Sequence, residues 1–186
     1  MVYRTARGQK LPYRLYVPED YNPAEKYPLV LFLHGFEALG SDNLKQVSGF
    51  DYQGSHVWTK HRCFVLAPQC PIGGAWALPV SRRPSRYLTR ALELLDDVRA
   101  RYAIDPARIY VTGQSLGGYG TWSAIAKRPD LFAAAVPVCG GGSARKAKDI
   151  AEVPVWAFHN TFDPIVLARE SRRMISAIRK AGGNPI

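Results

Sequence analysis

The chain has 186 residues, a formal net charge of +10 and 47% hydrophobic residues. This length suits one domain with a sizeable core and is too short for two. No apolar run approaches the roughly 18 residues that a membrane helix needs, and the polar start lacks the apolar stretch of a signal peptide. We expect a soluble protein that does not bind membranes. It would be secreted or periplasmic if the chain is an excised domain.

The positive charge is spread along the chain. One local cluster stands out: Arg82, Arg83, Arg86 and Arg90. No nucleic-acid fold signature or basic patch interleaved with aromatic residues accompanies it, so we interpret the charge as a solvated face and expect no nucleic-acid partner. The three cysteines are Cys63, Cys70 and Cys139. Their odd number, without metal-ligand spacing, argues against a disulfide framework or a metal site, although one disulfide remains open.

The expected elements alternate between strands and helices. Tyr3–Arg7 and Leu11–Val17, on either side of Gly8, predict an antiparallel hairpin at a sheet edge. Continuous apolar runs, typical of strands buried on both faces, follow at Leu29–Leu33, Phe64–Ala67, Ile109–Thr112, Ala133–Val138 and Val155–Phe158. Helical patterns lie between or after them at residues 88–102, Leu116–Lys127 and Val166–Ala181. This order predicts a mostly parallel sheet flanked by helices.

A serine lies at one strand-to-helix junction. Ser115 has Gly113 and Gly117 two residues to either side, directly after the run Ile109–Thr112 and before a helical pattern. A turn this tight strains the central residue and leaves no room for side chains at the flanking positions. We therefore expect Ser115 to be a nucleophile on an exposed turn with positive φ, beside the N-terminal amides of the new helix.

Two further strand ends complete a candidate site. His34-Gly35 ends the run Leu29–Leu33, and we expect the amides of Phe36 and Leu116 to form an oxyanion hole. Asp163 follows Val155–Phe158 at the same edge of the sheet, unlike Asp130, and is the expected acid. His34, Gln114 and Trp76 are candidate cleft residues, with core packing an equal alternative for Trp76.

Five stretches of the chain resemble a known protein family: YPLVLFLHG, FVLAPQCP, IDPARIYVTGQSLGGYGTW, RPDLFAAAVPVCGGG and VWAFHNTFDPIV. Together they are similar to bacterial carboxylesterases of the α/β-hydrolase superfamily, related to dienelactone hydrolases and polyhydroxybutyrate depolymerases. The resemblance implies an α/β-hydrolase fold and hydrolysis of small or polymer-linked esters. It also implies a Ser–His–Asp triad, an acyl-enzyme and no cofactor. Phe36 is bulkier than the residue relatives carry there, which bears on the acyl pocket, and His159-Asn160 replaces the family's His-Gly.

The histidine expected for the triad is missing from residues 1–186. In this superfamily it follows the acid, but no histidine follows Asp163. His34 belongs to the oxyanion loop, His61 precedes a strand and His159 ends the strand that carries the acid. We expect one α/β-hydrolase domain over residues 1–186, cut short before its last strand and histidine loop. The alternatives are a non-catalytic binding module, a peptidase or acyltransferase on the same fold, or a base supplied by His56 or another chain.

Overall fold

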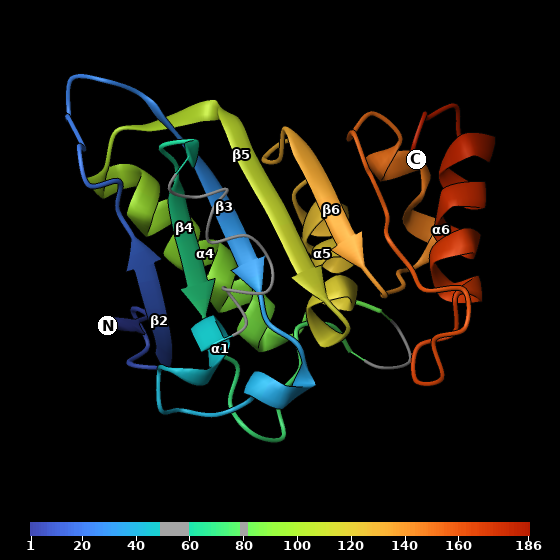
Figure 1. Ribbon diagram of the computed structural model, residues 1–186, viewed down its shortest axis with the longest axis horizontal. Helices are drawn as coiled ribbons and strands as arrows, with labels where there is room; N and C mark the ends of the chain where they lie inside the picture. Colours follow the sequence, from blue (N-terminus) through green and yellow to red (C-terminus); the bar gives the residue numbers. More distant parts are fainter. Residues whose placement is uncertain (49–59, 79–81) are drawn as a thin grey trace.

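The computed structural model describes residues 1–48, 60–78 and 82–186. Its sheet has six strands: β1 Val2–Arg4, β2 Lys10–Tyr16, β3 Tyr27–Leu33, β4 Phe64–Pro68, β5 Ile104–Gln114 and β6 Ala134–Val138. They are arranged in the order β1-β2-β4-β3-β5-β6 (Figure 1). The two β2 pairings are antiparallel, and the pairings among β4, β3, β5 and β6 are parallel. The predicted edge hairpin and parallel sheet are confirmed.

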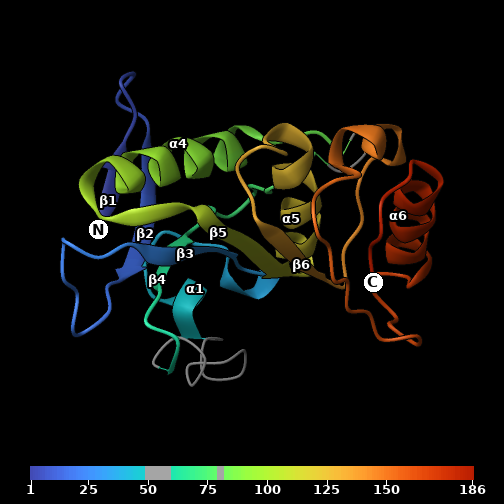
Figure 2. The same cartoon turned by 90° about the horizontal axis from the view of Figure 1, so that it is seen from above.

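Helices cover this sheet unequally. They are α1 Lys45–Ser48, α4 Arg86–Arg101, α5 Leu116–Lys127 and α6 Arg169–Lys180, with 3-10 turns η1 Phe36–Ala38, η2 Ala144–Lys146 and η3 Lys148–Ile150. Seen from above, α4 and α5 lie on one side of the sheet and the short α1 on the other, while α6 lies beyond β6 (Figure 2). No helix within the described ranges is both long and apolar enough to cross a bilayer.

The core lies mainly between the sheet and α4, α5 and α6. α4 begins at Ser85, whose hydroxyl accepts the amides of Tyr87 and Leu88, and this cap satisfies amides that the first turn leaves free. Leu88, Leu92 and Leu95, the predicted apolar face, are all buried. A smaller cluster around Phe32 and Val65 covers the opposite face. These layers hold the strands rigidly, so the loops at their ends start from fixed positions.

One predicted strand forms only in part. Val155–Phe158 runs parallel to β6 but is joined to it only by isolated bridges at Ala135 and Val138. Trp156 and Phe158 still donate to carbonyls of β6, at 3.1 and 3.0 Å. Pro137 of β6 has no N–H to return between these positions, which interrupts the ladder. The segment nevertheless delivers the following loop to the same edge of the sheet as the other parallel strands.

Candidate active site at the carboxyl ends of the strands

The parallel strands end together. Leu33 pairs with Gly113, Gln114 pairs with Val138, and Val138 is bridged to Phe158. In Figure 1 the arrowheads of β3, β4, β5 and β6 point to the lower edge of the sheet. The segments that follow these ends are therefore side by side, and they carry most of the predicted site.

Ser115 is the residue that turns the chain from β5 into α5. Its backbone has φ 54° and ψ −114°, a combination that residues other than glycine rarely adopt. Its amide donates to Val138 O at 2.9 Å, and its carbonyl accepts from Tyr119 at 3.0 Å. The side chain is partly exposed, and no described residue hydrogen-bonds its hydroxyl. The predicted positive φ is confirmed, and the hydroxyl is presented at the sheet edge.

The flanking glycines make this turn possible. A Cβ on Gly113 would lie 2.3 Å from Leu33 O and 2.7 Å from the carbonyl carbon of Gly117. A Cβ on Gly117 would lie 1.7 Å from the same Leu33 oxygen. Both obstacles are backbone atoms of packed elements, so neither position admits a side chain. The turn is thereby pressed against the end of β3, where the oxyanion loop begins.

Two backbone amides lie at the first residues of η1 and α5. Phe36 opens η1 after β3, and Leu116 opens α5 after β5. Among the described residues, none accepts a hydrogen bond from either amide, as expected for the first residues of helices. The N-terminus of α5 also carries a partial positive charge. Two free donors on adjacent strand ends suit the binding of a negatively charged oxygen.

His34 and Trp76 lie beneath this edge. His34 is 2% exposed. Its Nε2 accepts the Cys70 amide at 2.9 Å, which places the ring proton on Nδ1, next to Gly35 O at 2.6 Å. Burial lowers the pKa of His34, so the ring is neutral. Trp76 is 0% exposed and donates to His34 O at 3.0 Å. For both side chains, burial favours packing over direct lining of a cleft, while Gln114 is exposed at the edge.

Asp163 lies in the loop after Phe158. Its Oδ1 accepts the amides of Ile165 and Val166, both at 2.9 Å. These two hydrogen bonds lower the pKa of the carboxyl group, the Val166 bond being the larger cause. Oδ2 lies 3.8 Å from Nε2 of His159. The loop thus holds Asp163 ionised, with one oxygen free of these backbone contacts.

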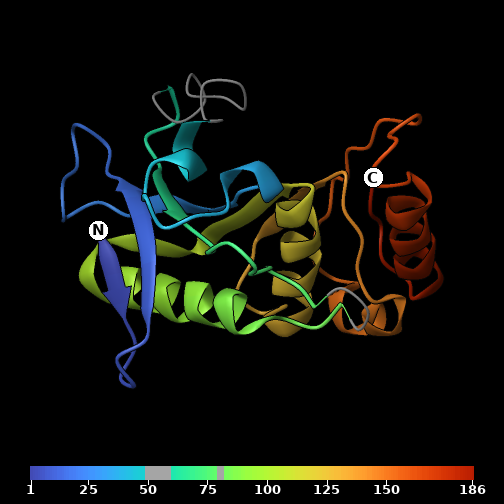
Figure 3. The same cartoon turned by 90° about the horizontal axis from the view of Figure 1, so that it is seen from below.

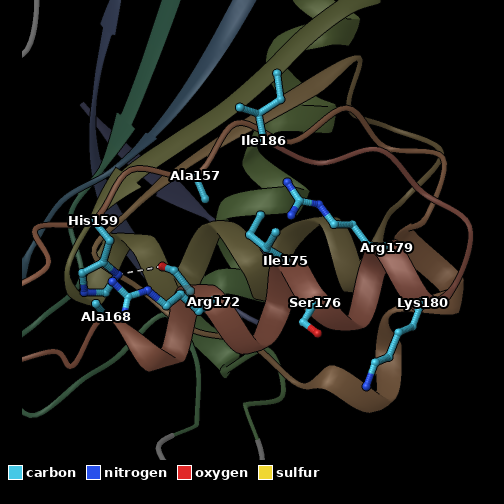
Figure 4. Close-up of a pocket in the computed structure, with 10 residues that line it drawn as sticks. Ala157, His159, Ala168, Arg172, Ile175, Ser176, Arg179, Lys180 and Ile186 are labelled. Carbon is cyan, nitrogen blue, oxygen red and sulfur yellow. Dashed lines mark hydrogen bonds between the residues drawn. The ribbon is translucent and has the colours of Figure 1, made fainter.

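His159 is already engaged by its own surroundings. Its Nδ1 is 2.7 Å from Ser171 Oγ, and its Nε2 is 2.7 Å from Val166 O. Figure 4 shows His159 at one end of a pocket that Ile186 also lines. With both ring nitrogens bound, His159 fastens the Asp163 loop to α6. It is not available to a substrate.

Cys139 and Glu37 are residues that the sequence reasoning did not place in the site. Burial is the largest cause that raises the pKa of the Cys139 thiol, whereas a hydrogen bond from the Ser115 backbone lowers it. The carboxylates of Asp163 and Glu37 raise it further. The backbone here joins the two segments, because Val138 O accepts from the Ser115 amide and the Cys139 amide donates to Phe158 O at 2.8 Å. The signal in the sequence was the position of Cys139, directly after an apolar run and before three glycines.

The remaining expectations concern bases, metals and disulfides. His61 precedes β4, at the opposite edge of the sheet, and His56 lies outside the described residues. Cys63, Cys70 and Cys139 are free thiols. Within the described ranges, no group of three or more His, Cys, Asp or Glu side chains is placed to hold a metal ion.

An apolar pocket of about 710 Å³ adjoins the oxyanion loop. Its lining includes Phe36, Leu39, Ile72, Leu78 and Tyr87. Phe36 is 72% exposed, so its ring is accessible to solvent where it lines this pocket. An apolar group bound here would lie next to the free amide of Phe36.

Comparisons with known proteins identify the fold and the family of this chain. A solved structure titled "Crystal Structure of a Thermostable Esterase" superposes with a TM-score of 0.93 and 40% identity over 100% of this chain and 52% of that one. Poly(3-hydroxyalkanoate) depolymerase C of Paucimonas lemoignei is 33% identical over 61% of this chain and 28% of its own length. The bifunctional acetylxylan esterase/xylanase XynS20E of Neocallimastix patriciarum is 24% identical over 88% of this chain and 23% of its own length.

The chain thus spans about a quarter of these curated relatives and about half of the solved esterase. The family model described as "Putative esterase" matches residues 5–170, a range that includes Phe36, Ser115 and Asp163. The chain therefore belongs to this putative esterase family, and its fold is α/β-hydrolase-like.

Proposed function

We propose that this protein is a serine carboxylic ester hydrolase in which Ser115 forms an acyl-enzyme. The observation that carries the proposal is the strained backbone of Ser115, with φ 54°. Its hydroxyl and the amides of Phe36 and Leu116 have no hydrogen-bond partner among the residues that the structure describes. Ser115 Oγ attacks the ester carbonyl, and the amides of Phe36 and Leu116 bind the oxyanion. The carbonyl–oxygen bond to the alcohol then breaks, and water later releases the acid.

Asp163 is the acid of the proposed triad, and its role is to orient a histidine. Its carboxylate is held ionised by two amides and is near enough to Cys139 to raise the pKa of that thiol, which supports this role. The histidine takes the proton of Ser115 Oγ and gives it to the leaving alcohol. None of the described histidines is in a position to do this.

We propose that the histidine follows Ile186 in the chain. The Ile186 amide donates to Val155 O at 2.9 Å, and the Ile186 carbonyl accepts from Ala157 at 2.8 Å. This is the pattern of a parallel pair of strands. A strand continuing from Ile186 would therefore run toward the edge that carries Asp163, and its next loop would reach the space beside Ser115. His56 and a histidine from another chain are the alternatives that the test must exclude.

The proposed substrate is a small or polymer-linked carboxylic ester. The apolar pocket beside Phe36 would hold its acyl or alcohol part. The relatives named as a poly(3-hydroxyalkanoate) depolymerase and an acetylxylan esterase support an ester bond as the target. Ester, amide and thioester substrates compared side by side would separate esterase from peptidase and acyltransferase chemistry.

The test compares two chains, residues 1–186 and a chain that extends beyond Ile186 through the next loop. Initial rates on p-nitrophenyl butyrate are measured for both, with thermal melts to show that both are folded. Without a base, the oxyanion hole and binding leave roughly 10³–10⁴ over the uncatalysed rate, so the shorter chain should be nearly inactive. The longer chain should be active, and Ser115→Ala should abolish its activity. A fully active shorter chain would contradict the assignment of the histidine, and His56→Ala would then be the next variant.

A further inference from the structure

A second pocket, of about 740 Å³, is strongly basic. Its charged lining consists of Arg82, Arg83, Arg145, Lys146, Glu170 and Arg173. These residues come from three segments that follow β4, β6 and the segment Val155–Phe158. The pocket also includes Ala126, near the end of α5. It therefore runs along the flank of α5, from Arg82, which lies over Tyr119 near the start of the helix, toward the end of the helix. Figure 3 shows α5 in olive, the orange segment of η2 and η3 beside it, and the red helix α6 beyond them.

The lining carries more positive than negative charge. Glu170 Oε2 is shared between Arg82 and Arg173, at 3.6 and 3.4 Å, so one carboxylate serves two guanidinium groups. Asp149 pairs with Lys146 at 2.7 Å. Arg145 is exposed and has neither an ion pair nor a hydrogen bond with any residue in the described ranges. Within the described part of the chain, Arg145 thus has no carboxylate partner, and Arg82 and Arg173 have one carboxylate between them.

The arginines are also held in position. Arg173 donates to Gly142 O at 2.9 Å, and Arg82 lies over the ring of Tyr119, 4.4 Å from its centroid. Planar guanidinium groups held in place in this way favour binding of carboxylates, because they present paired donors at little further cost in entropy. This preorganisation distinguishes the pocket from a loose basic surface.

Tyr119 connects the basic pocket to the nucleophile. Its amide donates to the carbonyl of Ser115, one turn earlier on α5, which corresponds to about 6 Å along the helix axis. The aromatic ring of Tyr119 contacts Arg82 on its other side. The Arg82 end of the basic pocket is therefore separated from Ser115 by about one helical turn.

We propose that this basic pocket binds a carboxylate carried by the ester substrate at a distance from the bond that is cleaved. The proposal rests on the proposed function, because it adds a substrate preference to the same site. It predicts faster hydrolysis of an ester with a terminal carboxylate than of a neutral ester of equal length. The preference should weaken at high salt, since the pocket is open to solvent.

The test uses the full chain, meaning the longer chain that extends beyond Ile186 through the next loop. Two matched substrates are compared: the mono-p-nitrophenyl ester of suberic acid and p-nitrophenyl octanoate. The measured quantity is the ratio of their kcat/KM values. Arg145→Gln and Arg173→Gln should each lower this ratio about tenfold, the scale of one charged hydrogen bond. Arg99→Gln is the matched control for Arg173, because Arg99 forms an equivalent i,i+3 ion pair with Asp96 at 3.2 Å on α4.

The ratio should be unchanged in Arg99→Gln. It is also insensitive to a general loss of folded protein, which lowers both rates equally. The proposal would be overturned if the ratio of the two kcat/KM values were the same in Arg145→Gln, Arg173→Gln, Arg99→Gln and the unsubstituted protein.

Binding separates this proposal from the proposed function. In a Ser115→Ala background, calorimetry with the suberic acid ester measures the dissociation constant without turnover, and Arg145→Gln should raise that constant about tenfold. If the full chain hydrolyses neither ester, the proposed function fails while the binding result still decides on the basic pocket. If both esters are hydrolysed but binding does not respond to Arg145→Gln, the basic pocket alone is wrong.

Discussion

Replacing Ser115 by glycine should stabilise the protein relative to replacing it by alanine, although both changes remove the nucleophile. Ser115 has φ 54° and ψ −114°, and a side chain in such a region costs about 1–3 kcal/mol. Glycine escapes this strain but loses about 0.5–1 kcal/mol in backbone entropy relative to alanine. The difference leaves Ser115→Gly more stable than Ser115→Ala by about 0.5–2 kcal/mol.

The assay is thermal unfolding of the two variants. For a chain of this size, 1 kcal/mol shifts Tm by about 2–4 °C, so Ser115→Gly should melt roughly 1–8 °C higher. Ser143, with an ordinary φ of −85°, provides the control: there glycine should be less stable than alanine. A lower Tm for Ser115→Gly than for Ser115→Ala would refute the claim that the elbow is strained.

Three further outcomes follow from the contacts at the sheet edge. Gly117→Ala forces a Cβ to within 1.7 Å of a backbone oxygen, so it should cost about 3 kcal/mol or more in stability and about 100-fold in activity, by denaturation and initial rates. Asp163→Asn keeps an oxygen for the loop amides and should lower kcat about 10⁴-fold with little change in Tm. Cys63 and Cys70 are buried, with pKa values raised to about 11 and about 12, whereas Cys139 is partly exposed, so iodoacetamide should modify Cys139 alone, slowly at neutral pH, and stop ester hydrolysis.

These outcomes can each fail in a distinct way. A Gly117→Ala protein of normal stability and rate would mean that the end of β3 can move aside. Full activity in Asp163→Asn would remove Asp163 from the triad. The pKa of Cys139 is raised, so thiolate is scarce at neutral pH and its alkylation should accelerate as pH rises toward that pKa. A rate independent of pH, or mass spectra showing all three thiols modified, would contradict the environment described for Cys139.

Most of the fold could be predicted because each parallel strand is a continuous apolar run. Leu29–Leu33 and Ile109–Thr112 fall within β3 and β5, although β5 extends further at both ends. The incomplete pairing of Val155–Phe158 could not be predicted from its own apolar pattern. The ladder is interrupted by Pro137, which lies in the neighbouring strand. Pairing depends on both partners, and the pattern of one strand describes only one of them.

The site could be predicted only where the backbone dictates it. The glycines around Ser115 reveal a turn with positive φ, because a close approach to Leu33 excludes side chains. The burial of Trp76 and the contact of Cys139 with the Ser115 backbone arise from the packing of loops that are distant in the sequence. No local pattern encodes such contacts. The same is true of the basic pocket, which three separate loops build.

The most direct test of the central claim is to map the site of covalent modification by a fluorophosphonate. Such reagents label a serine only when a base and an oxyanion hole activate it. The chain that extends beyond Ile186 is treated with the fluorophosphonate, digested and analysed by tandem mass spectrometry. Its Ser115→Ala variant is the control. We predict one phosphonylated residue, Ser115, and loss of ester hydrolysis in proportion to its labelling. An active protein that carries no adduct, or carries it on another residue, would contradict the account.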